Sequence, residues 1–334
     1  MRFFRFAGIC AFCNFGMGVV SITYFIRRKI PVLIAVALTL FLSAVGLPQK
    51  GYAEDNELTA IATTTLLWDL TENIAGERIQ VEFLMGPGID PHLYQASAED
   101  VYLLQNADLI ICNGFCLEER MGEMLDSFER EGKAVICIED GIDKNMFLEC
   151  QPGSGQYDPH VWFDVSLWKQ AAVYIANRLI LLDPHGGETY SKNLNKYLEE
   201  LNELEEYIKS RVSGIGEEHR ILVTDYDAFR YFCRAYGFEV KSLLGISTND
   251  EVRTADVSTL AGFIAENRIK AIFAESTLPE KNIEDLEASV REKGFETSIG
   301  GKLYSDSLGD EASGYGGYIE AFKANIDAIV DALK

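Results

Sequence analysis

The sequence predicts an α/β protein of two lobes, each a mostly parallel sheet with flanking helices, joined by a long rigid helix. Two observations predict this class. Short β-rich runs alternate with amphipathic stretches in both halves of the chain, which is typical of parallel sheets covered by helices. One amphipathic stretch between the halves is too long and too regular for a flexible linker. The length of 334 residues, about twice a common domain, agrees with two lobes.

The expected elements follow in order along the chain. Strands are expected at 59–64, 79–85, 108–112 and 134–138 in the first half, and at 221–224, 239–244, 269–274 and, weakly, 295–299 in the second. Helical periodicity fills the intervals, at 66–75, 97–105, 117–131, 166–182, 227–236, 255–267, 279–293 and 315–333.

Residues 187–213 are expected to form the linking helix. Apolar side chains recur there at three- and four-residue spacing, as at Tyr190, Leu194, Tyr197 and Leu201, with Glu and Lys between them. At ~1.5 Å per residue this helix is a rod of roughly 40 Å, long enough to cross a domain. It separates an N-terminal lobe at 54–186 from a C-terminal lobe at 214–334.

The first 53 residues have the pattern of a signal or targeting segment. Arg27-Arg28-Lys29 precedes an apolar run at 30–47, and Gly51-Tyr52-Ala53 places small residues at the −3 and −1 positions of a cleavage site. The apolar stretch at 3–25 is either a second membrane segment or lies upstream of the true start codon. No Cys lies at the boundary that follows the apolar run, so a lipid anchor has no attachment residue there. We expect a mature chain that begins at Glu54 and works in the periplasm or at the outer face of the cytoplasmic membrane.

The charge of the remaining chain argues against several partners. After residue 53 there are 24 Lys and Arg against 52 Asp and Glu, a formal charge of −28. Such a surface repels nucleic acid and anionic lipid and concentrates cations, although simple solubility also explains it. No nucleic-acid partner is expected. No apolar run after Gly51 approaches the ~20 residues of a membrane span.

Five Cys lie beyond the targeting segment, and an odd number permits at most two disulfides and one free thiol. Cys112, Cys137 and Cys233 fall in apolar strand or helix patterns and are expected in the core. Cys116 and Cys150 lie in predicted loops, where they can form a bridge.

Asp-Pro-His occurs twice, followed each time by an apolar and an aromatic residue. The two copies are Asp90-Pro91-His92-Leu93-Tyr94 and Asp158-Pro159-His160-Val161-Trp162. Each precedes a helical pattern, and the proline restricts the backbone just before the imidazole. The aspartate is placed to hold the second ring nitrogen, as metal-ligating His usually require. A single His is more simply explained by capping or by burial in the core, but the repeat favours a shared metal site. His185 and His219 lie in polar turns and are expected in solvent.

Further motifs follow in a fixed order along the chain. They are Gly86-Pro87-Gly88-Ile89-Asp90-Pro91-His92, Asn113-Gly114 with Glu118, Asp158-Pro159-His160-Val161-Trp162-Phe163-Asp164, Val223-Thr224 with Ala228-Phe229, Ala235-Tyr236-Gly237, Gly245-Ile246-Ser247-Thr248, Ile272-Phe273-Ala274-Glu275-Ser276 and Leu303-Tyr304-Ser305-Asp306-Ser307-Leu308-Gly309. With these motifs the chain resembles the metal-binding subunits of zinc, manganese and iron ABC importers, the TroA-like cluster A-I family. The resemblance implies one metal ion held between the lobes as cargo, two ligand positions per lobe and a membrane permease as partner. We expect a monomer.

Carried over residue by residue, the resemblance implies His92 and His160 as ligands in the N-terminal lobe and Asp306 as the last ligand. The third position departs from the family pattern. Family members have His or Glu between Val-Thr-x and x-Ala-Phe, where this chain has Tyr226.

Three explanations of that departure stay open. Tyr226 binds as a phenolate, or Asp225 or Asp227 takes its place, or the site has fewer protein ligands. Asp227 is also a good candidate to cap the helix expected from that residue. Glu275 ends a predicted strand, where it either supports the site or is solvated.

The donor set favours some metals over others. Two imidazoles with oxygen donors suit manganese or iron better than zinc. Phenol has a pKa of ~10, so phenolate binding requires a strongly acidic metal such as ferric iron, or help from the local field. Many zinc-specific relatives carry a His-rich loop, and the corresponding stretch at 139–157 has no His. The expected cargo is one ion, Mn²⁺ or iron first and then Zn²⁺.

Two other functions use the same residues. A metallohydrolase would need an open metal position and a general base, for which Asp225, Asp227 or Glu275 are candidates. Against an enzyme, the sequence has no nucleophile elbow, HExxH helix or phosphate-binding glycine loop. The second alternative is a binder of an organic ligand or a surface partner, whose metal site decayed when Tyr226 replaced a ligand.

Overall fold

The computed structural model describes residues 58–249 and 251–334. The predicted targeting segment at 1–53, with its cleavage site, lies outside the described residues. Within the described ranges, no helix combines the length and the apolar character that crossing a membrane requires.

The first lobe is built on a parallel four-stranded sheet in the order β2-β1-β3-β4. The strands are β1 (Leu58–Thr64), β2 (Ile79–Met85), β3 (Leu109–Cys112) and β4 (Ala134–Cys137). The helices are α2 (Thr65–Ala75), α3 (Ala98–Asn106), α4 (Gly122–Arg130) and α5 (Val165–Leu182). All of β3 is buried, as expected for an apolar central strand covered on both faces.

Side-chain caps determine where three of the four helices of this lobe, α2, α3 and α5, begin. Thr64 accepts a hydrogen bond from the backbone N–H of Leu67, Ser97 forms a capping box with Asp100, and Asp164 accepts from Ser166. Each cap satisfies an N–H group that has no partner inside its helix. The loops that lead into α3 and α5, which carry the two Asp-Pro-His motifs, therefore end at defined residues.

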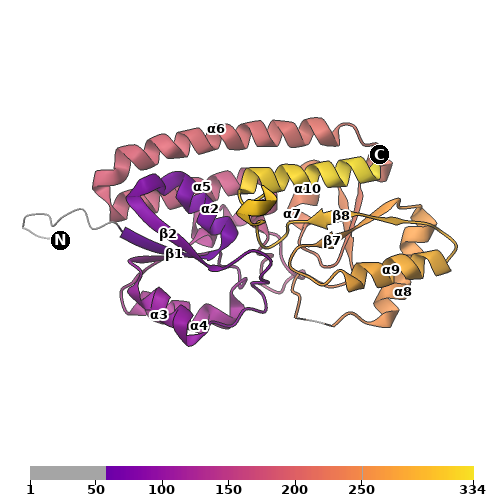
Figure 1. The fold of residues 1–334 in the computed structure, drawn as a ribbon, viewed down its shortest axis with the longest axis horizontal. Helices are drawn as coiled ribbons and strands as arrows, with labels where there is room; N and C mark the ends of the chain where they lie inside the picture. The colour runs from indigo at the N-terminus through magenta and orange to yellow at the C-terminus, as the bar shows by residue number, and fades with distance from the viewer. Residues whose placement is uncertain (1–57, 250) are drawn as a thin grey trace, which may run out of the picture. The chain divides into compact units, whose positions relative to one another are not determined.

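The second lobe contains two parallel strand pairs, β5–β6 and β7–β8. Its strands are β5 (Ile221–Thr224), β6 (Glu239–Ser242), β7 (Ala271–Glu275) and β8 (Ser298–Leu303). Its helices are α7 (Arg230–Tyr236), α8 (Thr254–Asn267), α9 (Lys281–Glu292) and α10 (Tyr318–Leu333) (Figure 1). Short 3-10 turns lie at Gly76–Arg78, Glu119–Met121, Ile138–Gly141, Lys144–Met146, Val161–Phe163, Pro184–Gly186, Glu217–His219 and Glu311–Ser313. The predicted α/β class with parallel sheets is confirmed.

Two predicted elements of the second lobe differ in detail. Helix α7 begins at Arg230 with no side-chain cap, so the prediction that Asp227 caps it is wrong. The backbone N–H of Asp227 donates instead to the carbonyl of Gly245, which holds this stretch as a loop. The weak strand expected at 295–299 runs over Ser298–Leu303. Its signal is weak because it contains Gly300 and Gly301, and glycine is depleted in strands.

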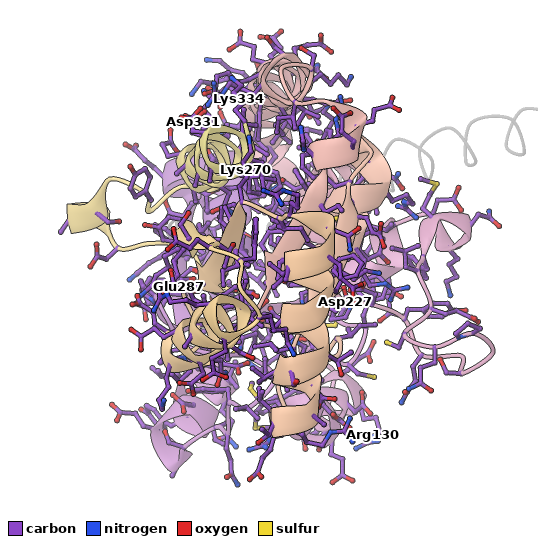
Figure 2. The ribbon with its side chains drawn as sticks, turned by 90° about the vertical axis from the view of Figure 1, so that its right-hand side faces the viewer. Arg130, Asp227, Lys270, Glu287, Asp331 and Lys334 are labelled. Carbon is purple, nitrogen blue, oxygen red and sulfur yellow. A yellow bond between two sulfur atoms is a disulfide. The ribbon has the colours of Figure 1, made fainter. Side chains whose placement is uncertain are left out.

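The linking helix α6 (Gly187–Val212) has 26 residues and is therefore ~39 Å long. It passes over the first lobe and runs beside α10 of the second (Figure 1). The hydroxyl of Tyr207 donates to Asp327 on α10 at 2.6 Å, and Arg211 pairs with Asp331 at 2.7 Å. The long helix predicted from the apolar periodicity is confirmed, and its rigidity stays a prediction. At the end of α10, Lys270 donates to the carbonyl of Lys334 at 2.6 Å (Figure 2).

Aromatic rings from both lobes form one continuous core. The ring of Phe163 lies 4.2 Å from that of Phe229 and 5.7 Å from that of Phe322, measured between centroids. Trp168 stacks on Tyr318 at 5.1 Å. These five side chains are buried. Rotation of one lobe against the other must disturb this packing, which makes large hinge motions costly.

The cysteine pairing differs from the expectation. A disulfide joins Cys112 to Cys137, which lie opposite each other in the register of β3 and β4. Cys116 and Cys150 are free thiols, so the bridge considered between them is not present. The apolar patterns around Cys112 and Cys137 indicated two strands, but not that these strands are neighbours in register. Cys233 is buried, as predicted.

Candidate metal centre

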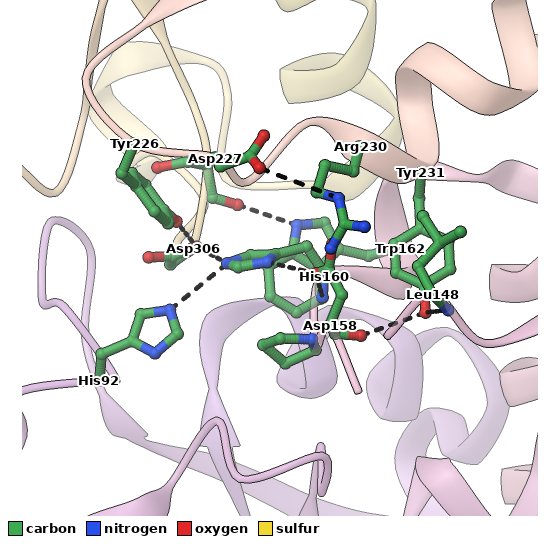
Figure 3. Close-up of polar contacts among 12 residues, drawn as sticks. His92, Leu148, Asp158, His160, Trp162, Tyr226, Asp227, Arg230, Tyr231 and Asp306 are labelled. Atoms are coloured by element: carbon green, nitrogen blue, oxygen red, sulfur yellow. Dashed lines mark hydrogen bonds and ion pairs between the residues drawn. The ribbon is translucent and has the colours of Figure 1, made fainter. Parts of the chain in front are cut away.

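The two Asp-Pro-His motifs bring their imidazoles together. His92 lies in the loop that follows β2, and His160 directly precedes the turn Val161–Phe163. Their Nε2 atoms are 3.4 Å apart, and both side chains are buried. The repeat that identified these residues in the sequence therefore corresponds to one pair in space (Figure 3).

The second lobe supplies Tyr226 and Asp306. Tyr226 follows β5 and Asp306 follows β8, so both lie just beyond the carboxyl ends of parallel strands, where open α/β sheets bind their ligands. Oδ1 of Asp306 is 3.6 Å from Nε2 of His160 and accepts a short hydrogen bond from the Tyr226 hydroxyl (Figure 3). Both side chains are buried. All four residues predicted from the sequence as metal ligands thus lie together.

Three of these residues have the spacing of a metal site. One ligand atom from each of His92, His160 and Asp306 lies within 4.8 Å of the others, which among the described residues is the one such group of His, Cys, Asp or Glu. Oδ2 of Asp306 is buried and has no hydrogen-bond partner. Because a buried carboxylate oxygen without a hydrogen-bond partner is energetically costly, this oxygen is suited to binding a cation. Asp225 and Asp227, the alternatives to Tyr226, lie outside the group.

The aspartates of the two motifs have different contacts. Oδ1 of Asp158 is 2.7 Å from Nδ1 of His160, as the sequence predicted. Oδ1 of Asp90 accepts from the backbone N–H of His92 instead, and Oδ2 accepts from the Thr248 hydroxyl at 2.7 Å. The prediction that both aspartates hold their His ring is therefore wrong for Asp90. Because Thr248 belongs to the second lobe, Asp90 joins the two lobes beside the site.

Two buried glutamates support the loops around the site. Glu118 accepts from the Thr63 hydroxyl at 2.6 Å and from the backbone N–H of Asn113 at 2.8 Å. The Asn113 side chain in turn donates to the carbonyl of Pro159, next to His160, at 3.1 Å.

On the other side, Glu275 accepts from the backbone N–H of Tyr226 at 3.1 Å and is fully buried, so the solvated alternative for Glu275 is wrong. The positioning role of Asn113 was missed in the sequence because it depends on contacts 46 residues apart.

Burial and neighbouring charges together shift the pKa values of the site residues. Burial lowers the pKa of His92 to about 3, and the nearby His160 adds to this effect. Burial acts in the same direction on His160, but Asp158 and then Asp306 raise its pKa above the usual value. Burial raises the pKa of Asp306 to about 6, with His160 opposing the shift. His92 is therefore neutral at physiological pH, the form of imidazole that binds metals.

The same burial acts on Tyr226. It raises the pKa of the phenol well above its usual value, and the charges of Asp306 and Glu275 add to the shift. Without a cation, the phenol keeps its proton and donates a hydrogen bond to Asp306. To a cation, these four residues can offer two imidazole nitrogens, a carboxylate oxygen and a phenolic oxygen. This is a mixed set of nitrogen and oxygen donors.

A cavity of about 330 Å³ lies beside His92 and is lined also by Cys116, Cys150, Asp227 and Ser247. This cavity connects the site with residues of both lobes. Near it, Arg120 bridges the lobes by donating to the carbonyl of Leu93 at 3.0 Å and to the side chain of Asn249 at 3.2 Å.

The fold and the site together define the class of metal-binding subunits of ABC importers. The family model described as ZnuA, zinc-uptake complex component A, periplasmic, matches residues 61–332. The chain belongs to this family, and the resemblance inferred from the sequence motifs is confirmed.

Individual relatives extend over nearly the whole chain. The zinc-binding protein TroA of Treponema pallidum is 40% identical over 296 residues, which cover 89% of this chain and 94% of TroA. The manganese-binding lipoprotein MntA of Bacillus subtilis is 38% identical, with coverage of 89% and 96%. The solved structure of the periplasmic zinc-binding protein TroA from Treponema pallidum has a TM-score of 0.80 at 40% identity and covers 83% of this chain and 99% of its own.

Proposed function

We propose that this chain is an extracytoplasmic solute-binding protein that captures a divalent transition-metal ion between its lobes and delivers it to an ABC permease. The observation that carries the proposal is the buried group of His92, His160 and Asp306. These residues come from two lobes, and one ligand atom of each lies within 4.8 Å of the others. The relatives named above bind zinc or manganese, and a manganese ABC transporter substrate-binding lipoprotein of Streptococcus pneumoniae is 29% identical over 306 residues.

His92, His160, Tyr226 and Asp306 are the proposed ligands. Two imidazoles and two oxygen donors favour manganese or iron, with zinc next, because zinc sites are richer in nitrogen and sulfur. Tyr226 occupies the slot that the family resemblance assigns to a ligand, and its hydroxyl already contacts Asp306. The geometry places no carboxylate of Asp225 or Asp227 in the same group.

The proposed location is the periplasm or the outer face of the cytoplasmic membrane, and the proposed partner is the permease of the importer. The family description and the relatives are periplasmic proteins or lipoproteins by name. The strong negative charge opposes nucleic-acid binding and attracts cations. We propose a monomer, because one chain supplies all four proposed ligands.

A hydrolytic role is disfavoured by the same geometry. Two of the three candidate bases are engaged elsewhere: Glu275 accepts from the backbone N–H of Tyr226 at 3.1 Å, and Asp227 pairs with Arg230 at 3.8 Å. The third, Asp225, is buried and lies outside the group of His92, His160 and Asp306. The donor atoms are buried. A site of this kind is suited to holding an ion rather than to activating water for attack on a larger substrate.

Elemental analysis of the protein, purified without chelator and then titrated with manganese, iron and zinc, tests the proposal. We expect about one bound ion per chain. Loss of a direct ligand in His92→Ala or His160→Ala should lower the affinity by more than the ~10–100-fold typical of residues that only support a ligand. His219→Ala is the control, because His219 is half exposed and lies in the turn before β5, at the opposite end of that strand from Tyr226. Metal content unchanged in both site variants would refute the assignment.

A further inference from the structure

Two free thiols lie at the cavity that borders the proposed metal site. Cys116 is exposed, Cys150 is half-buried, and both line the cavity of about 330 Å³ that also contains His92 and Asp227. Among the described cysteines, Cys112 is bonded to Cys137 and the free thiol of Cys233 is buried in α7, so Cys116 and Cys150 are the two free thiols at this cavity.

Ring contacts hold the two cysteine loops against each other. Phe115, next to Cys116, packs edge-on against Phe147 with centroids 4.7 Å apart, and Phe147 contacts Tyr157 at 5.1 Å. The backbone N–H of Cys150 donates to the carbonyl of Gln156 at 2.8 Å, one residue before Tyr157. The contact between Phe115 and Phe147 therefore joins the two loops, next to Cys116 in one loop and three residues before Cys150 in the other.

The loop of Cys116 has an unusual backbone. Phe115 and Cys116 have φ angles of 53° and 62°, in the left-handed region that residues with a Cβ rarely adopt. Glu139 holds this conformation by accepting from the backbone N–H of Phe115 at 2.6 Å. A strained conformation persists only where its surroundings impose it, and such conformations gather at functional sites. Here it places the Cys116 side chain at the cavity.

We propose that Cys116 and Cys150 form a reversible disulfide at the mouth of the metal site. The Cys116 thiolate attacks the disulfide of a thiol–disulfide oxidant and expels one thiol. The Cys150 thiolate then displaces the second thiol from the mixed disulfide. Two cysteine thiols lose two electrons and two protons in this reaction, and the disulfide of the oxidant is reduced to two thiols.

The oxidant must be a disulfide-transferring protein or a small disulfide, because the thiols are not strongly activated. Burial raises the pKa of both thiols. The negative charge of Glu119 adds to the shift at Cys116, and that of Asp158 adds to it at Cys150. Thiolate is therefore scarce at neutral pH, and the reaction should accelerate as the pH rises.

The bond would affect the segment that carries His160. The backbone N–H of Asp158 donates to the carbonyl of Leu148 at 2.8 Å, and Arg230 donates to the carbonyl of Glu149 at 2.9 Å. The chain at Cys150 is thus attached to the residues just before His160. Joining it to Cys116 restrains one wall of the cavity, so metal exchange should slow several-fold in the oxidised form. Only this second effect rests on the proposed function.

The test exposes the full chain, free of metal, to glutathione disulfide at mildly alkaline pH, followed by non-reducing peptide mapping. We expect a linked pair of peptides containing Cys116 and Cys150, with Cys112–Cys137 intact. Cys116→Ser and Cys150→Ser should instead retain a glutathione adduct on the remaining thiol, and Cys233→Ser should behave as the parent. Stable glutathione adducts on both thiols of the parent, or exchange of Cys116 into the Cys112–Cys137 bond, would overturn the proposal.

A second measurement separates this inference from the proposed function. Metal exchange is followed by competition with a chelating dye before and after oxidation. A linked peptide pair with no metal bound in either state supports the disulfide and refutes the metal function. A linked pair with unchanged exchange in a metal-binding protein refutes the proposed effect on the cavity.

Discussion

Nδ1 of His160 lies 2.7 Å from Oδ1 of Asp158, and neither side chain is exposed to solvent. The same oxygen accepts from the backbone N–H of His160 at 3.1 Å. This arrangement fixes the orientation of the ring and directs Nε2 towards His92 and Asp306. In the other motif Asp90 binds the backbone of His92 and the hydroxyl of Thr248, and not the ring.

The two aspartates should therefore contribute unequally to metal binding. Asp158→Asn keeps the shape of the side chain but removes the negative charge that binds Nδ1 of His160. We therefore expect the metal affinity to fall by ~10–100-fold. Asp90→Asn is the matched variant, and it should lower the metal affinity clearly less than Asp158→Asn. Competition titration with a chelating dye measures both. Equal losses would contradict the asymmetry between the two motifs.

Tyr226 and Asp225 are distinguished by a second pair of variants. If Tyr226 binds the metal, loading with ferric iron should produce a phenolate-to-metal charge-transfer band in the visible spectrum, and Tyr226→Phe should abolish it. Asp225→Asn should leave the band in place. If Tyr226→Phe binds manganese and iron as well as the parent while Asp225→Asn does not, then Tyr226 only covers the site and Asp225 is the third ligand.

The continuous aromatic core and α6 should restrict the motion of the lobes. The contact of Phe163 with Phe229, at 4.2 Å, would be broken by a wide hinge opening. We expect metal to change the radius of gyration in solution scattering very little, unlike the response of proteins with hinged lobes. A contraction of several ångströms on adding metal would show that the joint is flexible.

Asp69 should make the stability depend on pH at a point remote from the metal site. Asp69 on α2 accepts a hydrogen bond at 3.3 Å from the backbone N–H of Tyr318, which begins α10. Burial raises the pKa of Asp69 to about 7, and the backbone of Tyr318 and the charge of Glu320 modify the shift. The unfolded value is ~4.

The sign of this dependence follows from proton binding. Between pH ~4 and about 7 the folded state binds a proton at Asp69 that the unfolded state has lost, so the free energy of unfolding falls as the pH rises through this window. Asp69→Asn should flatten that fall and stabilise the protein most at pH 8. Glu203→Gln is the control, because Glu203 is exposed and lines, together with Asp69, a separate cavity of about 290 Å³. Denaturant unfolding at pH 5 and pH 8 measures the effect, and identical pH profiles for the parent and Asp69→Asn would refute it.

Local patterns in the sequence were sufficient for much of the fold. Strand–helix alternation predicted the parallel sheets, and the three- and four-residue spacing of Tyr190, Leu194, Tyr197 and Leu201 predicted α6. These signals are local because the period of a helix or strand is set by backbone geometry. The prediction of a cap at Asp227 was wrong because a tertiary contact, the bond from its N–H to Gly245, overrides the local preference.

By itself, the sequence determined the α/β class, the long helix that connects the lobes and the two loops that present His92 and His160, because these depend on periodicity and on short motifs. Only the tertiary structure decided which side chains meet. It joins Cys112 to Cys137, directs Asp90 to Thr248 rather than to the ring of His92, and places Tyr226 against Asp306, 80 residues away. These contacts depend on strand order and on the packing of the lobes, which no local window of sequence contains.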